Sequence, residues 1–193
     1  MFSPLIHRLQ ECWPRAISTT ISRRWLRLAP ILLVRNLPAL GSVLYVQLQS
    51  ARRPTRQLPR GLLIESMQLA PLLQGHRLMA ASTITVEGPR EWIECIDRDG
   101  RPSAQLHLLP DTDYLAWDAL LSSAKPLGAP SPACRSHPCR PVAAQLLCFH
   151  MRRLAGLDVL GAETTTRVSA LSRQLVAQIA REEAQAWQPT TRR

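Results

Sequence analysis

Cysteine and histidine side chains gather in one short segment of the sequence. The segment "CRSHPCRPVAAQLLCFH" holds five possible metal ligands, which are Cys134, His137, Cys139, Cys148 and His150. Four ligands of these types are enough for a tetrahedral zinc site. Their spacing matches none of the usual zinc-finger patterns. The proline-rich surroundings favour an irregular loop with incidental cysteines, followed by a helix with Cys148 in its core.

Other motifs that carry chemistry are missing from the sequence. It holds no nucleotide-binding loop, no G-x-S-x-G and no H-E-x-x-H. Glu91, Glu94, Asp97 and Asp99 form an acidic run that could do acid–base work, but a solvated hairpin end is the simpler interpretation. The sequence therefore favours a binding protein over an enzyme.

The charge of the chain is strongly positive and unevenly distributed. The net charge is +10 over 193 residues, and Lys125 is the only lysine. Between residues 1 and 64 the single acidic residue is Glu11. Such a segment attracts nucleic acid, acidic lipid or a carboxylate-bearing ligand. The alternative is that this N-terminal segment is basic but has no specific binding partner.

The most apolar stretch, residues 28–46, does not predict a membrane span. Arg35 interrupts it, and Pro30 and Pro38 break it further. The five cysteines are odd in number and irregularly spaced, which argues against a secreted disulfide framework. We therefore expect a cytoplasmic protein.

The pattern along the chain predicts an α+β fold with an antiparallel meander. Segments with strand composition follow one another from residue 42 to residue 109, joined by short turns. Asp99-Gly100 is a strong hairpin signal. After Pro110, Asp111 or Thr112 can cap a helix. We expect a curved sheet covered by helices, with a C-terminal helical extension.

Local patterns predict further helices and strands. Residues 3–28 should form one or two short helices, residues 62–73 a strand, and residues 142–156 and 164–187 one helix each. The expected organisation is a basic N-terminal helical segment at 1–36, a sheet domain at 37–123, a proline-rich linker at 124–141 and C-terminal helices at 142–188.

The strand after the Asp99-Gly100 turn alternates clearly. Ala104, Leu106 and Leu108 point to one face, so Gln105 and His107 point to the other. This places His107 opposite the apolar row, without a packing role.

The order of these segments resembles the HemS-like family, the cytoplasmic hemin-transport and hemin-utilisation proteins of Gram-negative bacteria. The motifs that carry the resemblance are "DRDG" at 97–100, "YLAWDAL" at 114–120 and "LPALGSVLYVQ" at 37–47. It covers about residues 37–123, one repeat where the classical members have two. The resemblance implies a curved antiparallel sheet with haem held against one face, and a homodimer partner could replace the second repeat.

One departure from the family concerns the iron ligand. Classical members carry a histidine after the first strand, where this chain has "QLQSARRPTRQLPRG". This ligand cannot be carried over, so His76 and His107 become the candidate iron ligands. The alternative for each is that the histidine is a solvent-exposed strand residue without a ligand role. The arginines that could pair with haem propionates are Arg52, Arg53, Arg56, Arg60 and Arg77.

Three functions follow from the sequence. The first is haem (hemin) binding with intracellular haem or iron trafficking, which would make hemin the partner. The second is a basic nucleic-acid-binding or regulatory module, and the third is a small zinc-stabilised interaction protein.

Overall fold

The structure is a computed structural model. It describes residues 20–49, 61–75, 77–85, 88–128 and 140–186. The strands are β1 (Ser22–Arg27), β2 (Ser42–Leu48), β3 (Leu62–Ile64), β4 (Arg77–Thr85), β5 (Gly88–Ile96), β6 (Pro102–His107), β7 (Lys125–Leu127), β8 (Pro141–Leu154) and β9 (Leu157–Thr164). The helices are α1 (Pro30–Asn36), α2 (Ala70–Gln74), α3 (Tyr114–Ser122) and α4 (Ala170–Ala186), with two 3₁₀ turns, η1 (Leu37–Leu40) and η2 (Met67–Leu69).

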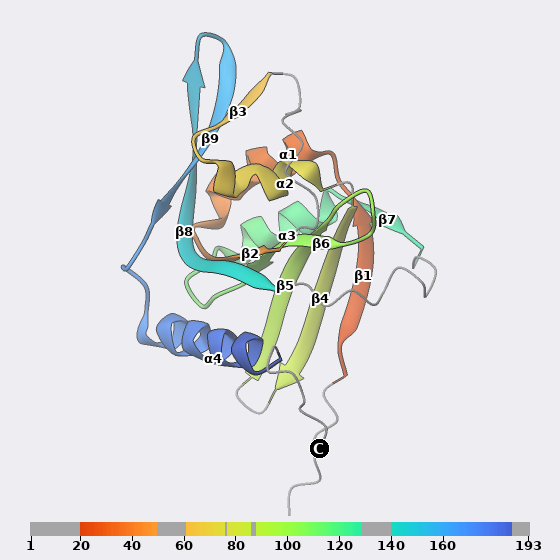
Figure 1. Cartoon of the computed structure of the whole chain (residues 1–193), viewed down its shortest axis with the longest axis vertical. Coiled ribbons are helices and arrows are strands. Elements are labelled where there is room, and N and C mark those ends of the chain that lie inside the picture. The colour runs from red at the N-terminus through yellow and green to blue at the C-terminus, as the bar shows by residue number, and fades with distance from the viewer. Residues whose placement is uncertain (1–19, 50–60, 76, 86–87, 129–139, 187–193) are drawn as a thin grey trace, which may run out of the picture.

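All nine of these strands join one sheet, in the order β3-β9-β8-β2-β6-β5-β4-β1-β7 (Figure 1). The pairs are antiparallel except β3 with β9, which is parallel. The predicted α+β class is confirmed. Among the described residues, no helix is long and apolar enough to cross a membrane.

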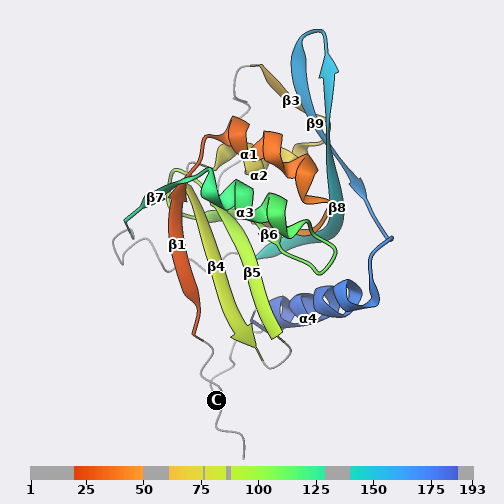
Figure 2. The same ribbon diagram turned by 180° about the vertical axis from the view of Figure 1, so that it is seen from behind.

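Helices α1, α2 and α3 cover one face of the sheet, which we call the helical face (Figure 2). Their inward side chains Leu33, Val34, Leu72, Trp117 and Leu120 are at most 2% exposed. The strands contribute Val43, Tyr45, Ile93, Ala104 and Leu106, among others. Each large apolar side chain buried in this way stabilises the fold by about 1.5–3 kcal/mol.

Helix α4 packs on the opposite face, which we call the second face (Figure 1). Its Ile179 joins a separate apolar cluster with Leu44, Val46 and Leu48 of β2. The helix covers only this part of the sheet. The second face over β1, β4 and β5 carries a further apolar cluster, formed by Trp25, Met79, Ala81, Trp92 and Ile96.

The predicted hairpin between β5 and β6 is confirmed. The carboxylate of Asp97 accepts hydrogen bonds from the backbone N–H groups of Asp99, at 2.8 Å, and Arg101, at 2.9 Å. Gly100 has φ +80, a conformation that favours glycine. The turn fixes the register that places His107 opposite Trp92.

The predicted cap of α3 is displaced by one or two residues. Asp113 is the N-cap, and its carboxylate accepts from the backbone N–H of Ala116 at 2.9 Å. Thr112 instead accepts from the backbone N–H of Leu109 and donates to the carbonyl of Ser42. The carboxylate of Asp111 accepts from the backbone N–H of Ser169 at 2.6 Å, which ties this loop to the segment before α4.

The helix predicted over residues 142–156 is wrong, because this segment forms β8 and the turn into β9. Residues 141–148 of β8 pair with β2, and residues 147–154 pair with β9. Ala, Leu and Gln favour a helix in isolation, but pairing on both sides of a central strand outweighs that preference. Of the predicted C-terminal helices only α4 exists within residues 141–186.

Two further predictions of local structure are corrected. Part of the N-terminal helix predicted over residues 3–28 is strand β1, and residues 1–19 lie outside the described part. The strand predicted over residues 62–73 is the short β3 followed by η2 and α2.

Strand β7 lies within the predicted linker, of which residues 129–139 are outside the described part. The sheet also includes β1, β8 and β9, beyond the 37–123 segment, and the domain boundaries stay a prediction.

Candidate functional site

The second face carries a row of side chains that crosses five strands. His107 of β6 pairs with Leu44 of β2 on one side and with Trp92 of β5 on the other. Trp92 pairs with Ala81 of β4, and Ala81 pairs with Arg23 of β1. Because paired residues of neighbouring strands point to the same face, these five side chains lie side by side.

A second row runs parallel to the first, two residues further along each strand. It consists of Val46, Gln105, Glu94, Met79 and Trp25, from β2 to β1. A third row begins at Ile96, which pairs with Arg77. Leu26 of β1 pairs with Leu78 of β4, so the next residue of β1, Arg27, lies beside Arg77. On its other side Arg27 pairs with Lys125 of β7.

Polar side chains of the first two rows form a hydrogen-bonded network. The carboxylate of Glu94 accepts from the indole N–H of Trp92 at 3.0 Å and from the amide nitrogen of Gln105 at 3.2 Å. The amide oxygen of Gln105 lies 3.3 Å from Nε2 of His107. Since the amide nitrogen of Gln105 faces a carboxylate, its oxygen faces His107 and accepts from an Nε2–H. This arrangement leaves Nδ1 as the nitrogen with the lone pair.

His107 is held as a neutral imidazole. It is 7% exposed. Burial, with the charge of Arg90 as the second cause, lowers its pKa from 6.5 to about 4. A metal ligand must offer a lone pair, so the neutral form is the one that can bind iron. His107 lies opposite the apolar row, as predicted, but it is buried rather than solvent-facing.

Glu94 is the second titratable group of the network, and its side chain is half-buried. Burial raises its pKa above the usual 4.5, and the hydrogen bonds from Trp92 and Gln105 oppose this rise. The sequence interpretation of this acidic run as a solvated hairpin end is therefore wrong for Glu94. It remains right for Asp99, which is exposed in the turn.

An aromatic patch covers the second face over β1, β4 and β5. We define it by Trp25, Met79, Ala81, Trp92 and Ile96, which form one apolar cluster. Met79, Ala81 and Ile96 are at most 6% exposed, and the two tryptophans are partly exposed. The patch spans three strands, a width of about 10 Å at the usual strand spacing.

Cations border the aromatic patch at two of its edges. Arg27, Arg77 and Lys125 lie together in the third row, and all three are exposed. Arg23, also exposed, lies at the end of the first row. A planar apolar surface with a basic edge suits a flat, hydrophobic ligand that carries carboxylates on one side.

Helix α4 borders the patch on the side of β6. Arg90, which is 9% exposed, forms an ion pair with Glu182 and lies 3.5 Å from the amide oxygen of Gln178. This pair fixes α4 beside Trp92 and His107. Arg90 and α4 therefore lie at the His107 end of the face.

Most of the site residues predicted from the sequence fall outside the described part. These are His76, Arg52, Arg53, Arg56, Arg60, Cys134, His137 and Cys139. Of the remaining candidates, His107 and Arg77 share the second face, at opposite sides of the aromatic patch. Their roles stay predictions.

Cys148 and His150 lie on β8, away from the aromatic patch. Sγ of Cys148 is 3.3 Å from the hydroxyl of Ser42, and Nε2 of His150 is 3.2 Å from a carboxylate oxygen of Glu65. Within the described residues, no group of three or more His, Cys, Asp and Glu side chains could hold a metal ion. The predicted zinc set depends on three residues outside that part.

Sequence reasoning missed the aromatic patch. Its signal was present in "SRRWLR", where Arg23, Trp25 and Arg27 alternate with Ser22, Arg24 and Leu26. That pattern predicts a strand with a basic, aromatic face. The missing piece was that Trp92 of a distant strand joins Trp25 on one surface.

Comparison with known proteins gives matches only among solved structures. No family model and no curated protein matches the sequence. One solved structure is ChuS, an E. coli heme oxygenase, with a TM-score of 0.42 and 17% identity over 57% of this chain and 37% of that chain. Another is holo-PhuS, a heme-binding protein from Pseudomonas aeruginosa, with a TM-score of 0.39 and 19% identity over 62% of this chain and 40% of that chain. The chain thus spans about two fifths of the length of either protein.

Proposed function

We propose that the chain binds hemin on the aromatic patch of the second face. The observation that carries the proposal is the patch itself, where two tryptophans and a methionine are bordered by Arg27, Arg77 and Lys125. A porphyrin is flat and apolar and carries both propionates on one edge. The patch offers a matching apolar surface, and the third row offers guanidinium groups, which bind carboxylates bidentately. The motif resemblance of residues 37–123 supports the same ligand.

The iron ligand is proposed to be a neutral histidine. His107 is the candidate within the described residues, because its imidazole stays neutral at physiological pH and Gln105 orients it. Trp92 covers it, so this ligand role requires the indole to move aside. His76, which precedes Arg77 in the sequence, is the other candidate. Trp25 and Met79 would hold the ring of bound hemin and Arg77 its carboxylates, and the hemin would supply iron for coordination and redox chemistry.

Intracellular storage or delivery of hemin is the role that we propose for this binding. The patch is on one face of a sheet, so a ring bound there can leave without unfolding the core. The proposed role predicts that hemin-loaded protein passes its hemin to apomyoglobin. The transfer is measured from the Soret band of the acceptor.

An absorbance titration with hemin and with its dimethyl ester tests the binding proposal. The ester keeps the ring and the iron but lacks the two carboxylates. Hemin should give a saturable, shifted Soret band at lower concentration than the ester. An Arg27→Gln, Arg77→Gln double variant should lose most of this preference, because it removes two solvent-exposed charge pairs that contribute about 0.2–1 kcal/mol each. Equal binding of both ligands by the wild-type protein would contradict the role of the basic edge.

A nucleic-acid interface is the second candidate, and one observation favours it. Arg23, Trp25 and Arg27 alternate cation, aromatic and cation on a single strand face. Single-stranded nucleic acids bind to surfaces of this kind by stacking and by phosphate contacts. Such binding weakens steeply with salt, whereas ring stacking by hemin does so much less. An oligonucleotide titration at two salt concentrations separates the two functions.

A further inference from the structure

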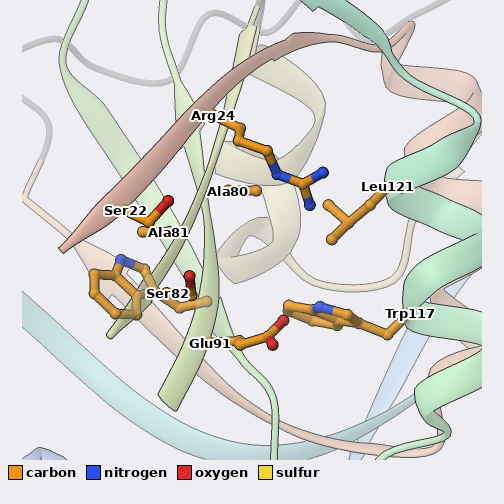
Figure 3. A pocket seen from close by; sticks show the side chains of 9 residues that line it. Ser22, Arg24, Ala80, Ala81, Ser82, Glu91, Trp117 and Leu121 are labelled. Atoms are coloured by element: carbon orange, nitrogen blue, oxygen red, sulfur yellow. The ribbon is translucent and has the colours of Figure 1, made fainter. Parts of the chain in front are cut away.

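A small cavity lies on the helical face, on the opposite side of the sheet from the aromatic patch. Its volume is about 170 Å³. It lies between β1, β4 and β5 on one side and α3 on the other (Figure 3). Cavities for larger cofactors measure about 300–1,000 Å³, so this one suits a much smaller molecule.

Small residues on β4 create the cavity. Ser22, Ser82 and Glu91 are paired neighbours across three strands, and Arg24 pairs with Ala80 one row along. Ala80 and Ser82 fill little space at the centre of the floor, while Trp117 and Leu121 of α3 form the opposite wall. A larger side chain at residue 80 would occupy the space.

The polar groups that line the cavity have no partners within the described part of the chain. This holds for the hydroxyls of Ser22 and Ser82, the guanidinium of Arg24 and the carboxylate of Glu91. It holds also for the indole N–H of Trp117, although this side chain is 1% exposed. Buried polar groups are nearly always hydrogen-bonded, and an unpaired one destabilises the folded state. Trp117 therefore calls for an acceptor that the described residues do not supply.

The charges around the cavity are arranged on two sides. Figure 3 shows the guanidinium of Arg24 with Leu121 on one side, and the carboxylate of Glu91 with the indole of Trp117 on the other. One cation and one anion attract a ligand that carries both signs. A simple anion would meet Glu91, and a simple cation would meet Arg24, so neither alone satisfies the lining.

We propose that this cavity binds a small zwitterion of the α-amino acid class. The ligand carboxylate pairs with Arg24 and accepts hydrogen bonds from the nearby donors, and the ligand ammonium pairs with Glu91. The aliphatic part of the ligand contacts Ala80 and Leu121. The side chains of Arg24, Ser82 and Glu91 lie on the helical face, whereas the hemin surface is on the second face, although Ala81 and Trp92 of the aromatic patch also line the cavity.

Nuclear magnetic resonance of the tryptophan indole N–H groups tests the proposal directly. The Trp117 signal is assigned as the one that a Trp117→Phe variant lacks. L-alanine and L-serine are titrated into the full-length wild-type protein, beside propionate ion, which lacks the ammonium of alanine, and ethylammonium, which lacks its carboxylate. Both amino acids should shift the Trp117 signal saturably, with the half-charged analogues about tenfold weaker or more.

Variants distinguish a built site from general surface binding. Arg24→Gln and Glu91→Gln should each weaken L-alanine binding about tenfold or more, by removing one charge-assisted contact. Ala80→Leu should abolish binding by filling the cavity, and Ile84→Ala, at a 73% exposed residue of the same strand, should leave it unchanged. No saturable shift with either amino acid, or equal binding by wild-type and both charge variants, would overturn the proposal. Hemin binding should be the same in the Arg24→Gln and Glu91→Gln variants.

Discussion

The imidazole of His107 stacks on the indole of Trp92, with ring centroids 6.1 Å apart and an angle of 23° between the ring planes. The two residues are paired neighbours on adjacent strands, so the stack crosses β5 and β6. The stack joins the polar network of Glu94, Gln105 and His107 to the aromatic patch. Because the stack shields His107 from water, the imidazole stays neutral, and this state can be tested through the pH dependence of stability.

Folding stability should fall as the pH drops from about 6.5 to about 4. The pKa of His107 is lowered to about 4 in the folded protein, against 6.5 when it is exposed. In this interval the unfolded chain takes up a proton that the folded chain does not, so acid favours unfolding. The loss amounts to about 3 kcal/mol at 1.36 kcal/mol per pKa unit. Urea unfolding at several pH values measures it.

A His107→Phe variant is the matched control, because it keeps an aromatic ring against Trp92 and removes the titration. Its stability should depend less on pH between 6.5 and 4. An identical pH profile for variant and wild type would show that His107 is not the group responsible.

Glu94→Gln should stabilise the protein at neutral pH. Burial raises the pKa of Glu94, so the folded state disfavours the ionised carboxylate relative to the unfolded state. The wild type therefore loses stability as the pH rises through the raised pKa, and a glutamine does not. The amide oxygen can still accept from Trp92 and Gln105. Thermal unfolding at acidic and at neutral pH measures the stability change that Glu94→Gln causes, and the exposed Glu163→Gln is the control. Destabilisation by Glu94→Gln at neutral pH would contradict the prediction.

Ile179→Ala should destabilise the protein by about 2–4 kcal/mol. Ile179 is 5% exposed and packs on Leu44, Val46 and Leu48, so it anchors α4 to the second face. Leu171 of the same helix is 66% exposed, and Leu171→Ala should cost little. Denaturant unfolding of the two variants gives the comparison. Equal effects would mean that α4 does not dock through this face.

Gly161→Ala should open the contact between Glu65 and His150. A Cβ atom at residue 161 would clash with the carboxylate of Glu65 and with Nε2 of His150, the two groups that converge there. We expect a loss of at most about 1 kcal/mol, because the atoms that must move are the far ends of two part-exposed side chains and an ion pair of this kind contributes little. Gly128→Ala is the control, because a Cβ there meets nothing within 4 Å. A much larger loss in Gly161→Ala would show that Glu65 and His150 cannot separate in this way.

The parts of the fold that the sequence predicted depend on local signals. The Asp99-Gly100 turn, the alternation through His107 and the helix after Pro110 can each be predicted from a few adjacent residues, and the structure confirms them. Strand β8 could not be predicted in this way, since its residues favour a helix until β2 and β9 pair with both sides.

The candidate site was predictable only in part, for a similar reason. His107 and Arg77 were identified by residue type, but their relation to Trp25 and Met79 depends on the register of four strands. The burial of His107 was missed because nothing in its own strand indicates that Trp92 covers it. On the last helix the structure buries the polar Ser172 and leaves the apolar Leu171 66% exposed, which residue type alone does not predict.

The most direct test of the proposed function is a hemin titration followed through the Soret band. Wild-type protein should give a saturable band, shifted from that of free hemin. A Trp25→Ala, Trp92→Ala double variant should bind at least about tenfold more weakly, because stacking on aromatic side chains contributes about 0.5–1.5 kcal/mol each beyond the buried area. Leu115→Ala, at an 83% exposed residue of α3, should bind as the wild type does. An unshifted wild-type spectrum, or equal affinity in the double variant, would contradict the account.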